Sequence, residues 1–209
     1  MSAVLKGPDG LARCAWGLST PDYVSYHDDE WGHPVADEGR IYEKLCLEGF
    51  QSGLSWLTIL RKRENFRAAF SKFDPKKVAK FTDVDVEKLL QDSGIVRHRG
   101  KILATINNAK ATMNLHAEGL TLAGLVWKYE PLRHKTLRGM ADIQATTEES
   151  KALSKDLIKR GFKFVGPTTV YSAMQSLGVV NDHMSKCYCH AICEAERGAF
   201  ARPFDQVST

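Results

Sequence analysis

Long apolar runs are absent from this 209-residue sequence. A membrane-spanning helix needs about 20 consecutive apolar residues, and an export signal needs an apolar core of about 7 to 15 residues. The N-terminal stretch MSAVLKGPDGLARCAWG contains neither. A hydrophobic content of 43% and a charged content of 26% are typical of a folded, water-soluble chain. We therefore expect a cytoplasmic protein with no membrane partner.

Cysteine is scarce and odd in number, with five in the chain. Without an expected export signal, an odd count argues against a disulfide framework and leaves metal binding or simple burial. The net charge of +4 permits a polyanionic partner without requiring one. The length suffices for one sizeable domain or two small lobes.

Alternation of apolar and polar residues, the pattern of a half-buried strand, is almost missing. Apolar residues recur at helical spacing instead, so the sequence predicts an all-α fold. Asp37 is expected to begin a helix that Gly49 ends, and Thr82-x-x-Asp85 to open one that Gly94 closes. The expected helices are 37–48, 54–70, a short one from 74, 82–90, 100–116, 149–160 and 168–177.

Residues 128–147 show no periodicity and are predicted to connect elements. We expect an N-terminal extension at 1–11, a helical domain of two lobes at 12–194, and a C-terminal tail of little signal at 195–209.

Two cysteine–histidine pairs stand near the ends of the chain: Cys14 with His27, and His183 with Cys187. Zinc in a structural role takes thiolate and imidazole ligands in a closed tetrahedron. Ordinary buried thiols and satisfied histidines explain the same four residues equally well. Three nearby residues could supply a ligand in place of Cys187 or have no metal-binding role: Cys189, His190 and Cys193.

Glu48 lies on the apolar stripe of its expected helix, three residues after Leu45 and seven after Ile41. A buried carboxylate must be hydrogen-bonded, neutralised or reserved for a polar or cationic ligand. The alternative is a boundary glutamate that reaches water or pairs with a basic side chain.

Aromatic residues gather in the same part of the chain: Trp16, Tyr23, Tyr26, Trp31 and Trp56. Such clusters usually form core. They also form the walls that hold a base flipped out of DNA, and a cationic base gains cation–π attraction there.

A basic, glycine-bounded connection, DSGIVRHRGKI at 92–102, joins two expected helices and resembles a helix-hairpin-helix element. Backbone N–H groups at a helix N-terminus and basic side chains both bind phosphate without reading sequence. A solvated basic turn is the competing interpretation. The residues concerned are Arg97, His98, Arg99, Gly100 and Lys101.

Six strings occur in an order typical of one family: RCAWG, YHDDEWG, LCLEGFQSGLSWLTILRKRENFR, DSGIVRHRGKI, KRGFKFVGPTTVYSAMQSLGVVNDH and SKC. They extend over roughly residues 12–190, so the match is more specific than any short motif. The chain resembles the bacterial 3-methyladenine DNA glycosylase I family, within the helix-hairpin-helix glycosylase superfamily.

This resemblance implies excision of a cationic alkylated purine from double-stranded DNA, by base flipping and hydrolysis of the N-glycosidic bond. It implies no nucleotide cofactor, and we expect a monomer. It also implies one structural zinc that joins the N- and C-terminal segments, with the ligands Cys14, His27, His183 and Cys187. The base pocket would fall on Glu48, Trp56 and Tyr26, with Trp16, Tyr23 and Trp31 nearby. Gly53 and Leu54 would form the turn that enters the duplex.

The chain departs from the wider superfamily in two places. Many relatives carry a V-D-T-H-like string whose aspartate supports catalysis, whereas Asn181 takes that place here, in Val180-Asn181-Asp182-His183. The hairpin also lacks the lysine that forms a Schiff base in bifunctional relatives, since Lys101 follows the second glycine and is expected to face phosphate. We therefore predict a monofunctional enzyme without lyase activity.

Two other functions would use some of the same residues. A zinc hydrolase or deaminase would need an open metal position, and the H-x-E…P-C-x-x-C pattern of deaminases is missing. A noncatalytic DNA-binding module would leave Glu48 and the aromatic cluster unexplained.

Overall fold

The computed structural model describes residues 2–203, and helices account for most of them. The helices are α1 (Pro21–Asp29), α2 (Glu38–Gln51), α3 (Trp56–Ala69), α4 (Pro75–Val78), α5 (Asp83–Gln91), α6 (Arg99–Ala117), α7 (Leu122–Trp127), α8 (Glu148–Lys159), α9 (Pro167–Ser176) and α10 (Tyr188–Ala199). Short 3-10 helices are η1 (Ala15–Leu18), η2 (Ser71–Phe73) and η3 (Met140–Asp142). The strands are β1 (Val4–Lys6) and β2 (Ala12–Cys14).

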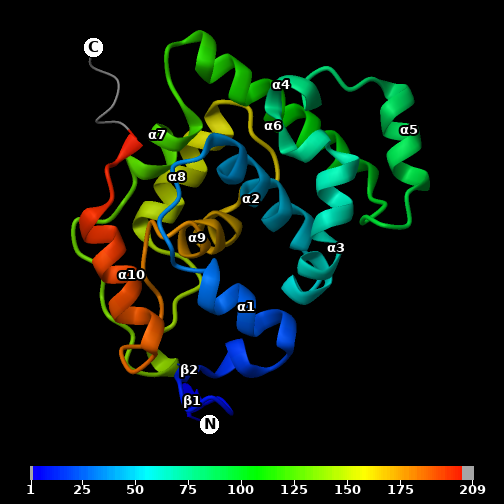
Figure 1. The fold of residues 1–209 in the computed structure, drawn as a ribbon. Coiled ribbons are helices and arrows are strands. Elements are labelled where there is room, and N and C mark those ends of the chain that lie inside the picture. Colours follow the sequence, from blue (N-terminus) through cyan, green and yellow to red (C-terminus); the bar gives the residue numbers. More distant parts are fainter. Residues whose placement is uncertain (1, 204–209) are drawn as a thin grey trace.

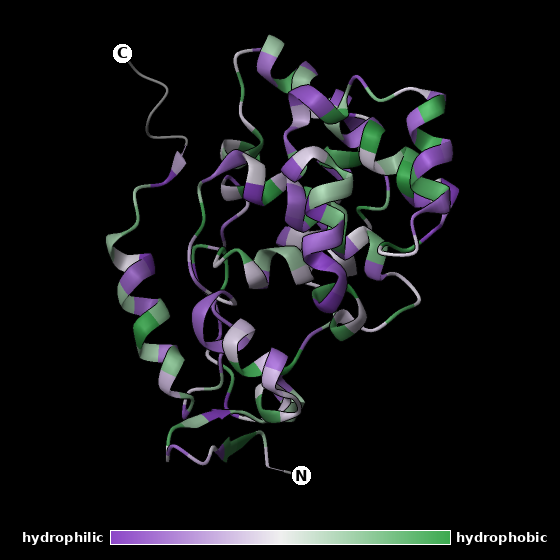
Figure 2. Ribbon diagram, turned by 45° about the vertical axis from the view of Figure 1, so that its right-hand side comes forward, coloured by the Kyte–Doolittle hydropathy of each residue, from purple (hydrophilic) through white to green (hydrophobic). Residues whose placement is uncertain are grey.

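Helix α2 occupies the middle of the fold. It packs against α3, α6, α7 and α9, and Figure 1 shows it surrounded by other helices. Hydrophilic and hydrophobic bands alternate along the helices (Figure 2), as expected when one side of each helix faces the core. The last turn of α2, which carries Glu48, is therefore inside the molecule.

Local signals predicted several helix starts correctly, whereas no helix was predicted at α1, α7 or α10. The Asp37 side chain accepts a hydrogen bond from the backbone N–H of Arg40 at the start of α2, and Thr82 forms the predicted capping box with Asp85. Pro75 begins α4 after Asp74, also as predicted. Residues 128–147 connect α7 to α8 and contain only η3 as regular structure.

Gly49 does not end its helix, contrary to the prediction, because α2 continues to Gln51. A Cβ at Gly49 would lie 3.1 Å from Cβ of Phe164, so the missing side chain allows the segment at Phe164 to pack closely against α2. Gly94 likewise lies beyond the end of α5, which stops at Gln91 with Asp92 as its C-cap.

Near both ends of the described range, 2–203, the structure contains elements that the sequence did not predict. β1 and β2 pair as an antiparallel hairpin with Val4 opposite Cys14, so the expected boundary after residue 11 falls between paired strands. At the other end, α10 continues through the expected boundary at 194 as far as Ala199. The rest of the predicted tail, 204–209, lies outside the described residues. Within 2–203 no helix is long and apolar enough to cross a membrane.

Candidate active site and metal centre

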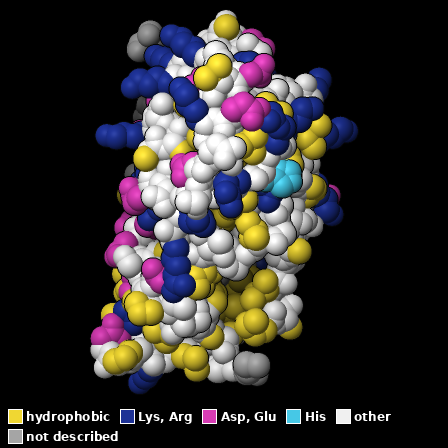
Figure 3. Space-filling view, turned by 90° about the vertical axis from the view of Figure 1, so that its right-hand side faces the viewer, with side chains coloured by type: hydrophobic (Ala, Val, Ile, Leu, Met, Phe, Trp, Pro, Cys, Tyr) yellow, Lys and Arg dark blue, Asp and Glu magenta, His cyan; other side chains and the backbone are white. Residues whose placement is uncertain are grey.

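A cavity of about 400 Å³ opens among α1, α2, α3 and α9. The connection between α7 and α8 contributes Leu137, Met140 and Ile143 to its wall. Figure 3 shows a hollow lined by hydrophobic side chains, with Lys and Arg side chains gathered above it on the same face. The polar residues that line the cavity are Glu48, Gln51, Ser172, Gln175 and Asp182.

Five aromatic residues proposed for a base pocket line this cavity: Trp16, Tyr23, Tyr26, Trp31 and Trp56. The ring centroids of Tyr26 and Trp56 are 5.4 Å apart, and Trp16 lies edge-on to Trp31 at 5.0 Å. Trp56 is the first residue of α3, whose N-cap Ser55 accepts a hydrogen bond from the N–H of Thr58. These rings form apolar walls suited to stacking on a planar ligand.

The carboxylate of Glu48 is buried and paired with a lysine on its own helix. Glu48 Oε1 lies 2.7 Å from Lys44 Nζ, one helical turn earlier, and both side chains are at most 11% exposed. The same ammonium donates a hydrogen bond to the Tyr26 hydroxyl at 2.7 Å. Burial lowers the pKa of Lys44, while the charge of Glu48 opposes that shift. Burial and the nearby Glu48 raise the pKa of Tyr26 well above its usual value.

Trp56 separates Lys44 from the cavity. The Lys44 ammonium lies 3.4 Å from the centroid of the indole. Lys44 lines a second, smaller cavity, and Trp56 and Tyr26 line both cavities. Trp56 Nε1 is buried without a hydrogen-bond partner in the described part of the chain. An unpaired buried donor is unusual and often marks a functional position.

Asn181 and Asp182 point in different directions. Asn181 Nδ2 donates to the backbone oxygen of His190 and to Glu194 Oε1, so this side chain faces α10. Asp182, for which the sequence suggested no role, is the carboxylate that lines the cavity. Three donors engage its oxygens at 2.5–2.7 Å: His134, Tyr171 and Gln175.

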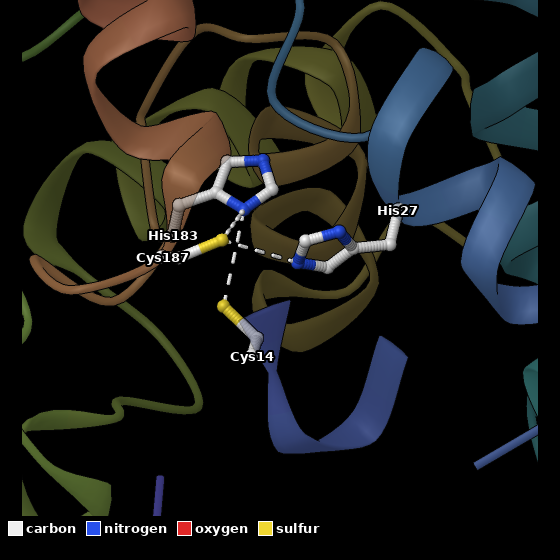
Figure 4. Close-up of side chains that lie close together, drawn as sticks. All are labelled: Cys14, His27, His183 and Cys187. Atoms are coloured by element: carbon white, nitrogen blue, oxygen red, sulfur yellow. Dashed lines mark hydrogen bonds between the residues drawn. The ribbon is translucent and has the colours of Figure 1, made fainter. Parts of the chain in front are cut away.

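Next to the cavity, the side chains of Cys14, His27, His183 and Cys187 converge (Figure 4). They come from β2, α1 and the segment between α9 and α10. Cys187 Sγ lies 3.5 Å from His27 Nε2 and 3.6 Å from His183 Nδ1, and Cys14 Sγ lies 3.8 Å from His183 Nδ1. The Cys14 and Cys187 thiols share one negative charge. The Cys187 sulfur therefore raises the pKa of Cys14, and the Cys14 sulfur lowers the pKa of Cys187.

These distances fit a tetrahedral zinc ion. Zinc bonds of about 2.3 Å to sulfur and 2.0–2.1 Å to nitrogen separate the two ligand atoms by about 3.6 Å in a tetrahedron. All four ligand atoms lie within 4.8 Å of one another, and all four residues are buried. Cys189 belongs to a second group, with His27 and Asp28, and is not among these four converging ligand atoms.

Surrounding groups fix the orientation of both histidines. His27 Nδ1 lies 2.8 Å from Asp28 Oδ1, and His183 Nε2 lies 2.8 Å from the backbone oxygen of Trp31. Each contact leaves the other ring nitrogen directed at the cluster, as in known zinc sites. A Cβ at Gly17 would lie 2.7 Å from the His27 ring, and one at Gly32 would lie 2.9 Å from the His183 ring. Both glycines therefore make room for the two histidine rings.

The turn between α2 and α3 projects from the molecule beside the cavity. Gly53 has a φ of +81°, which glycine adopts without strain, and Leu54 is 42% exposed. Gln51, at the end of α2, lines the cavity and accepts a hydrogen bond from the Leu54 N–H. An exposed leucine therefore stands next to the ligand-sized opening.

The basic connection lies between α5 and α6, as predicted. Arg97, His98, Arg99 and Gly100 are exposed, and the His98 ring caps α6 by accepting from the Lys101 N–H. Lys101 is an exception. It was predicted to face phosphate, but it is buried and its ammonium donates to backbone carbonyls of Phe50 and Ser52 at 2.8 and 2.6 Å. The first turn of α6 directs this side chain inward, toward the end of α2.

A family model described as methyladenine glycosylase matches residues 16–190. The chain belongs to this family. It is 48% identical over 182 residues to DNA-3-methyladenine glycosylase 1 of Escherichia coli K12, covering 86% of this chain and 97% of that protein. A DNA-3-methyladenine glycosylase of Haemophilus influenzae is 46% identical, with coverage of 85% and 97%.

Solved structures of the methyladenine glycosylase family share the fold. A crystal structure of 3-methyladenine DNA glycosylase I superimposes with a TM-score of 0.82 at 48% identity, covering 85% of this chain and 99% of that one. A second, of a tyrosine-to-phenylalanine variant in complex with 3-methyladenine, gives a TM-score of 0.80 at 36% identity, with coverage of 85% and 97%.

Three parts of the site were not predicted from the sequence. Lys44 had a usable signal, because it stands four residues before Glu48 on the same helix face. Asp182 adjoins Asn181 and was visible as a neighbouring carboxylate. The contribution of 137–143 carried no signal, since an irregular segment has no periodicity that could locate it.

Proposed function

We propose that this protein is a monofunctional DNA N-glycosylase that excises 3-methyladenine from double-stranded DNA. Two named relatives are DNA-3-methyladenine glycosylases, and a related structure contains 3-methyladenine. The observation that carries the proposal is the buried Glu48 carboxylate in a cavity with aromatic walls. An anion beside indole and phenol rings favours a flat cation over a neutral base of the same shape.

The chemistry follows from the charge of the substrate. Methylation at the 3-position makes the base cationic while it is still attached to deoxyribose. When the bond between C1′ and the base nitrogen breaks, its electron pair neutralises the base, which leaves without an added proton. Water then attacks the oxocarbenium-like C1′ and releases one proton to solvent. Little acid catalysis is required, so recognition of the charged base provides selectivity.

Within this proposal Glu48 accepts hydrogen bonds from the exocyclic amine edge and opposes the charge of the base. Trp56 and Tyr26 stack on the base, and Trp16, Tyr23 and Trp31 complete the wall. A base in a duplex must be flipped out to reach a cavity of this kind. Gly53 and Leu54 would enter the duplex and fill the gap, and the exposure of Leu54 beside the opening supports this role.

We assign the exposed hairpin residues Arg97, His98, Arg99 and Gly100 to the DNA backbone. The α5–α6 connection would act as a helix-hairpin-helix element, with the N-terminus of α6 directed at a phosphate. Such contacts supply affinity and register without reading the sequence. The gathering of Lys and Arg side chains above the hollow in Figure 3 supports this assignment.

We assign a structural role to zinc at Cys14, His27, His183 and Cys187. Four protein ligands would leave no open position for water or substrate, which argues against a zinc hydrolase. Bound there, the ion would supply a crosslink and no chemistry on the base. Its ligands adjoin Trp16 and Trp31, whose rings contact His27 at 5.1 and 6.4 Å between centroids. The centre would thereby support one wall of the cavity.

Excision by the Glu48→Gln variant tests the proposed recognition. Under single-turnover conditions on duplex DNA containing 3-methyladenine, we expect the rate to fall by about 10- to 150-fold, because a charged hydrogen bond contributes about 1.5 to 3 kcal/mol. Glu148→Gln removes an exposed carboxylate on α8 and serves as the matched control. A Glu48→Gln rate equal to that of the wild type would refute the assignment.

Borohydride trapping tests the absence of lyase activity. A bifunctional enzyme forms a Schiff base with C1′ that borohydride reduces to a stable protein–DNA adduct. Lys44 and Lys101, the two lysines buried in the described part of the chain, are engaged by Glu48 and by backbone carbonyls. We therefore expect excision without an adduct, and a trapped complex would contradict the monofunctional assignment.

A further inference from the structure

Lys101 is a buried cation held by backbone atoms. The residue is 7% exposed, and its ammonium donates to the Phe50 carbonyl at 2.8 Å and the Ser52 carbonyl at 2.6 Å. Burial lowers its pKa, and no charged neighbour among the described residues contributes to the shift. Desolvating an ammonium without a carboxylate partner is costly, so these two contacts must compensate for it.

The two carbonyls occupy a particular place in the chain. Phe50 belongs to the last turn of α2, where the final carbonyls lack helical partners and carry the negative end of the helix dipole. Ser52 is the C-cap and directly precedes Gly53 and Leu54. Lys101 therefore fixes the backbone from which the projecting turn starts.

Lys101 itself lies in the first turn of α6, directly after the exposed residues of the hairpin. A single side chain thus links the basic connection to the α2–α3 turn. We propose that Lys101 is a positioning residue that holds the Gly53–Leu54 turn in place for entry into the duplex when the hairpin is bound to DNA. This inference rests on the proposed function, because it assumes a DNA duplex and a flipped base.

A double-mutant cycle between Lys101→Met and Leu54→Ala tests whether Lys101 acts through the turn. In single-turnover excision from duplex DNA, we expect the rate of each single variant to fall about tenfold or more. The double variant should be about as slow as the slower of the two single variants. If the rate loss of the double variant equalled the product of the two single losses, Lys101 would act independently of the turn, and the proposal would be overturned. Lys101→Arg keeps two donors and should restore most of the rate.

Two binding measurements separate this role from the others that a lysine has in DNA-binding proteins. If Lys101 contacted phosphate, Lys101→Met would lower the slope of log affinity against log salt concentration by about one. We expect the wild-type slope, and a reduction of that size would refute the proposal. Binding of free 3-methyladenine, followed by tryptophan fluorescence, should stay within about threefold of wild type, since a positioning residue for the turn leaves the cavity intact.

Lys110→Met is the matched control, because Lys110 is exposed on the same helix. Thermal unfolding of Lys101→Met and Lys101→Arg shows whether each variant is folded at the assay temperature. Loss of free-base binding together with excision in both variants would indicate general misfolding and count against the proposal. If the wild type released no 3-methyladenine, the proposed function would fail first, whereas normal wild-type excision with additive variants removes only the role of Lys101.

Discussion

The Lys44–Glu48 pair places two opposite charges 2.7 Å apart and almost out of contact with water. Removing one partner of such a pair strands the other charge in the interior, whereas neutralising both often costs little. Because Lys44 lies behind Trp56 and Glu48 lines the cavity, the lysine compensates the carboxylate from the side away from a bound ligand. A second, cationic partner can then approach Glu48 from the cavity.

Lys44→Met should lower the free energy of unfolding by about 3 kcal/mol, because it leaves the Glu48 carboxylate buried and unpaired. The double variant Lys44→Met/Glu48→Gln should recover most of this loss. Urea unfolding monitored by circular dichroism measures both. The exposed pair of Glu148 and Lys151 provides the control, and its neutralisation should change stability by less than about 1 kcal/mol. A double variant as unstable as Lys44→Met would show that Glu48 is compensated by other groups.

At the residue scale, the sequence was informative where a side chain type was unusual for its position. Glu48 stood out as a charge on an apolar stripe, and the aromatic residues stood out by their density. The lysines were harder to place, because a long flexible side chain takes its environment from neighbours distant in sequence. Lys101 follows a basic turn, yet its acceptors lie 49 and 51 positions away.

At the scale of elements, α1 and α3 form two walls of the cavity and are joined by an ion pair. Arg63 of α3 makes a bidentate contact with Glu30, the C-cap residue of α1, at 2.5 and 2.7 Å. Burial by itself would raise the pKa of Glu30, but hydrogen bonding and the charge of Arg63 outweigh it and lower the pKa. The carboxylate is thus more acidic in the folded state than in the unfolded chain.

This shift gives Glu30 a pH-dependent contribution to stability. A depressed folded-state pKa stabilises the protein above the unfolded value of about 4.3, and the stabilisation is lost as pH falls through the folded-state pKa. The free energy of unfolding of the wild type should exceed that of Glu30→Gln by about 1 kcal/mol at pH 7. The difference should shrink as pH falls below the unfolded value and on through the lowered folded-state pKa. Chemical unfolding at a series of pH values measures it. A gap that is constant with pH would mean that the ion pair contributes nothing.

Several boundaries that depend on local chemistry were predicted, whereas those that depend on distant contacts were not. The caps at Asp37 and Thr82 act within one turn of helix. Gly49 was misread because a close approach of Phe164, rather than a helix end, explains that glycine. The β1–β2 hairpin was missed because strands of three residues are too short to show alternation.

At the scale of the whole molecule, the Cys–His cluster brings both ends of the chain together. Cys14 ends β2, His27 lies in α1, and His183 and Cys187 precede α10, which packs against β2 (Figure 1). The sequence predicted the four residues through resemblance, while spacing alone could not separate ligands from ordinary buried thiols. Holding together segments so far apart in sequence costs the conformational entropy of closing a long loop. The free energy of binding a metal ion can compensate for that cost.

Removal of the proposed zinc ion should therefore destabilise the structure rather than simply inactivate it. We expect Cys187→Ser, or prolonged treatment with a strong chelator, to lower the Tm by at least about 10 °C, which corresponds to about 4 kcal/mol in a domain of this size. Limited proteolysis should then cut first in the segment 2–18, whose β2 and η1 are next to the centre.

Cys46→Ser is the matched control, because Cys46 is a buried thiol of α2 outside the cluster. Elemental analysis should find one zinc per chain in the wild type and in Cys46→Ser, and almost none in Cys187→Ser. Excision should decline in parallel with folding, since Trp16 and Trp31 lose the histidines against which they pack. A metal-free protein with the wild-type Tm would exclude a structural centre. An unchanged Tm with abolished excision would instead assign the ion to the chemistry, so the two measurements together decide what the centre does.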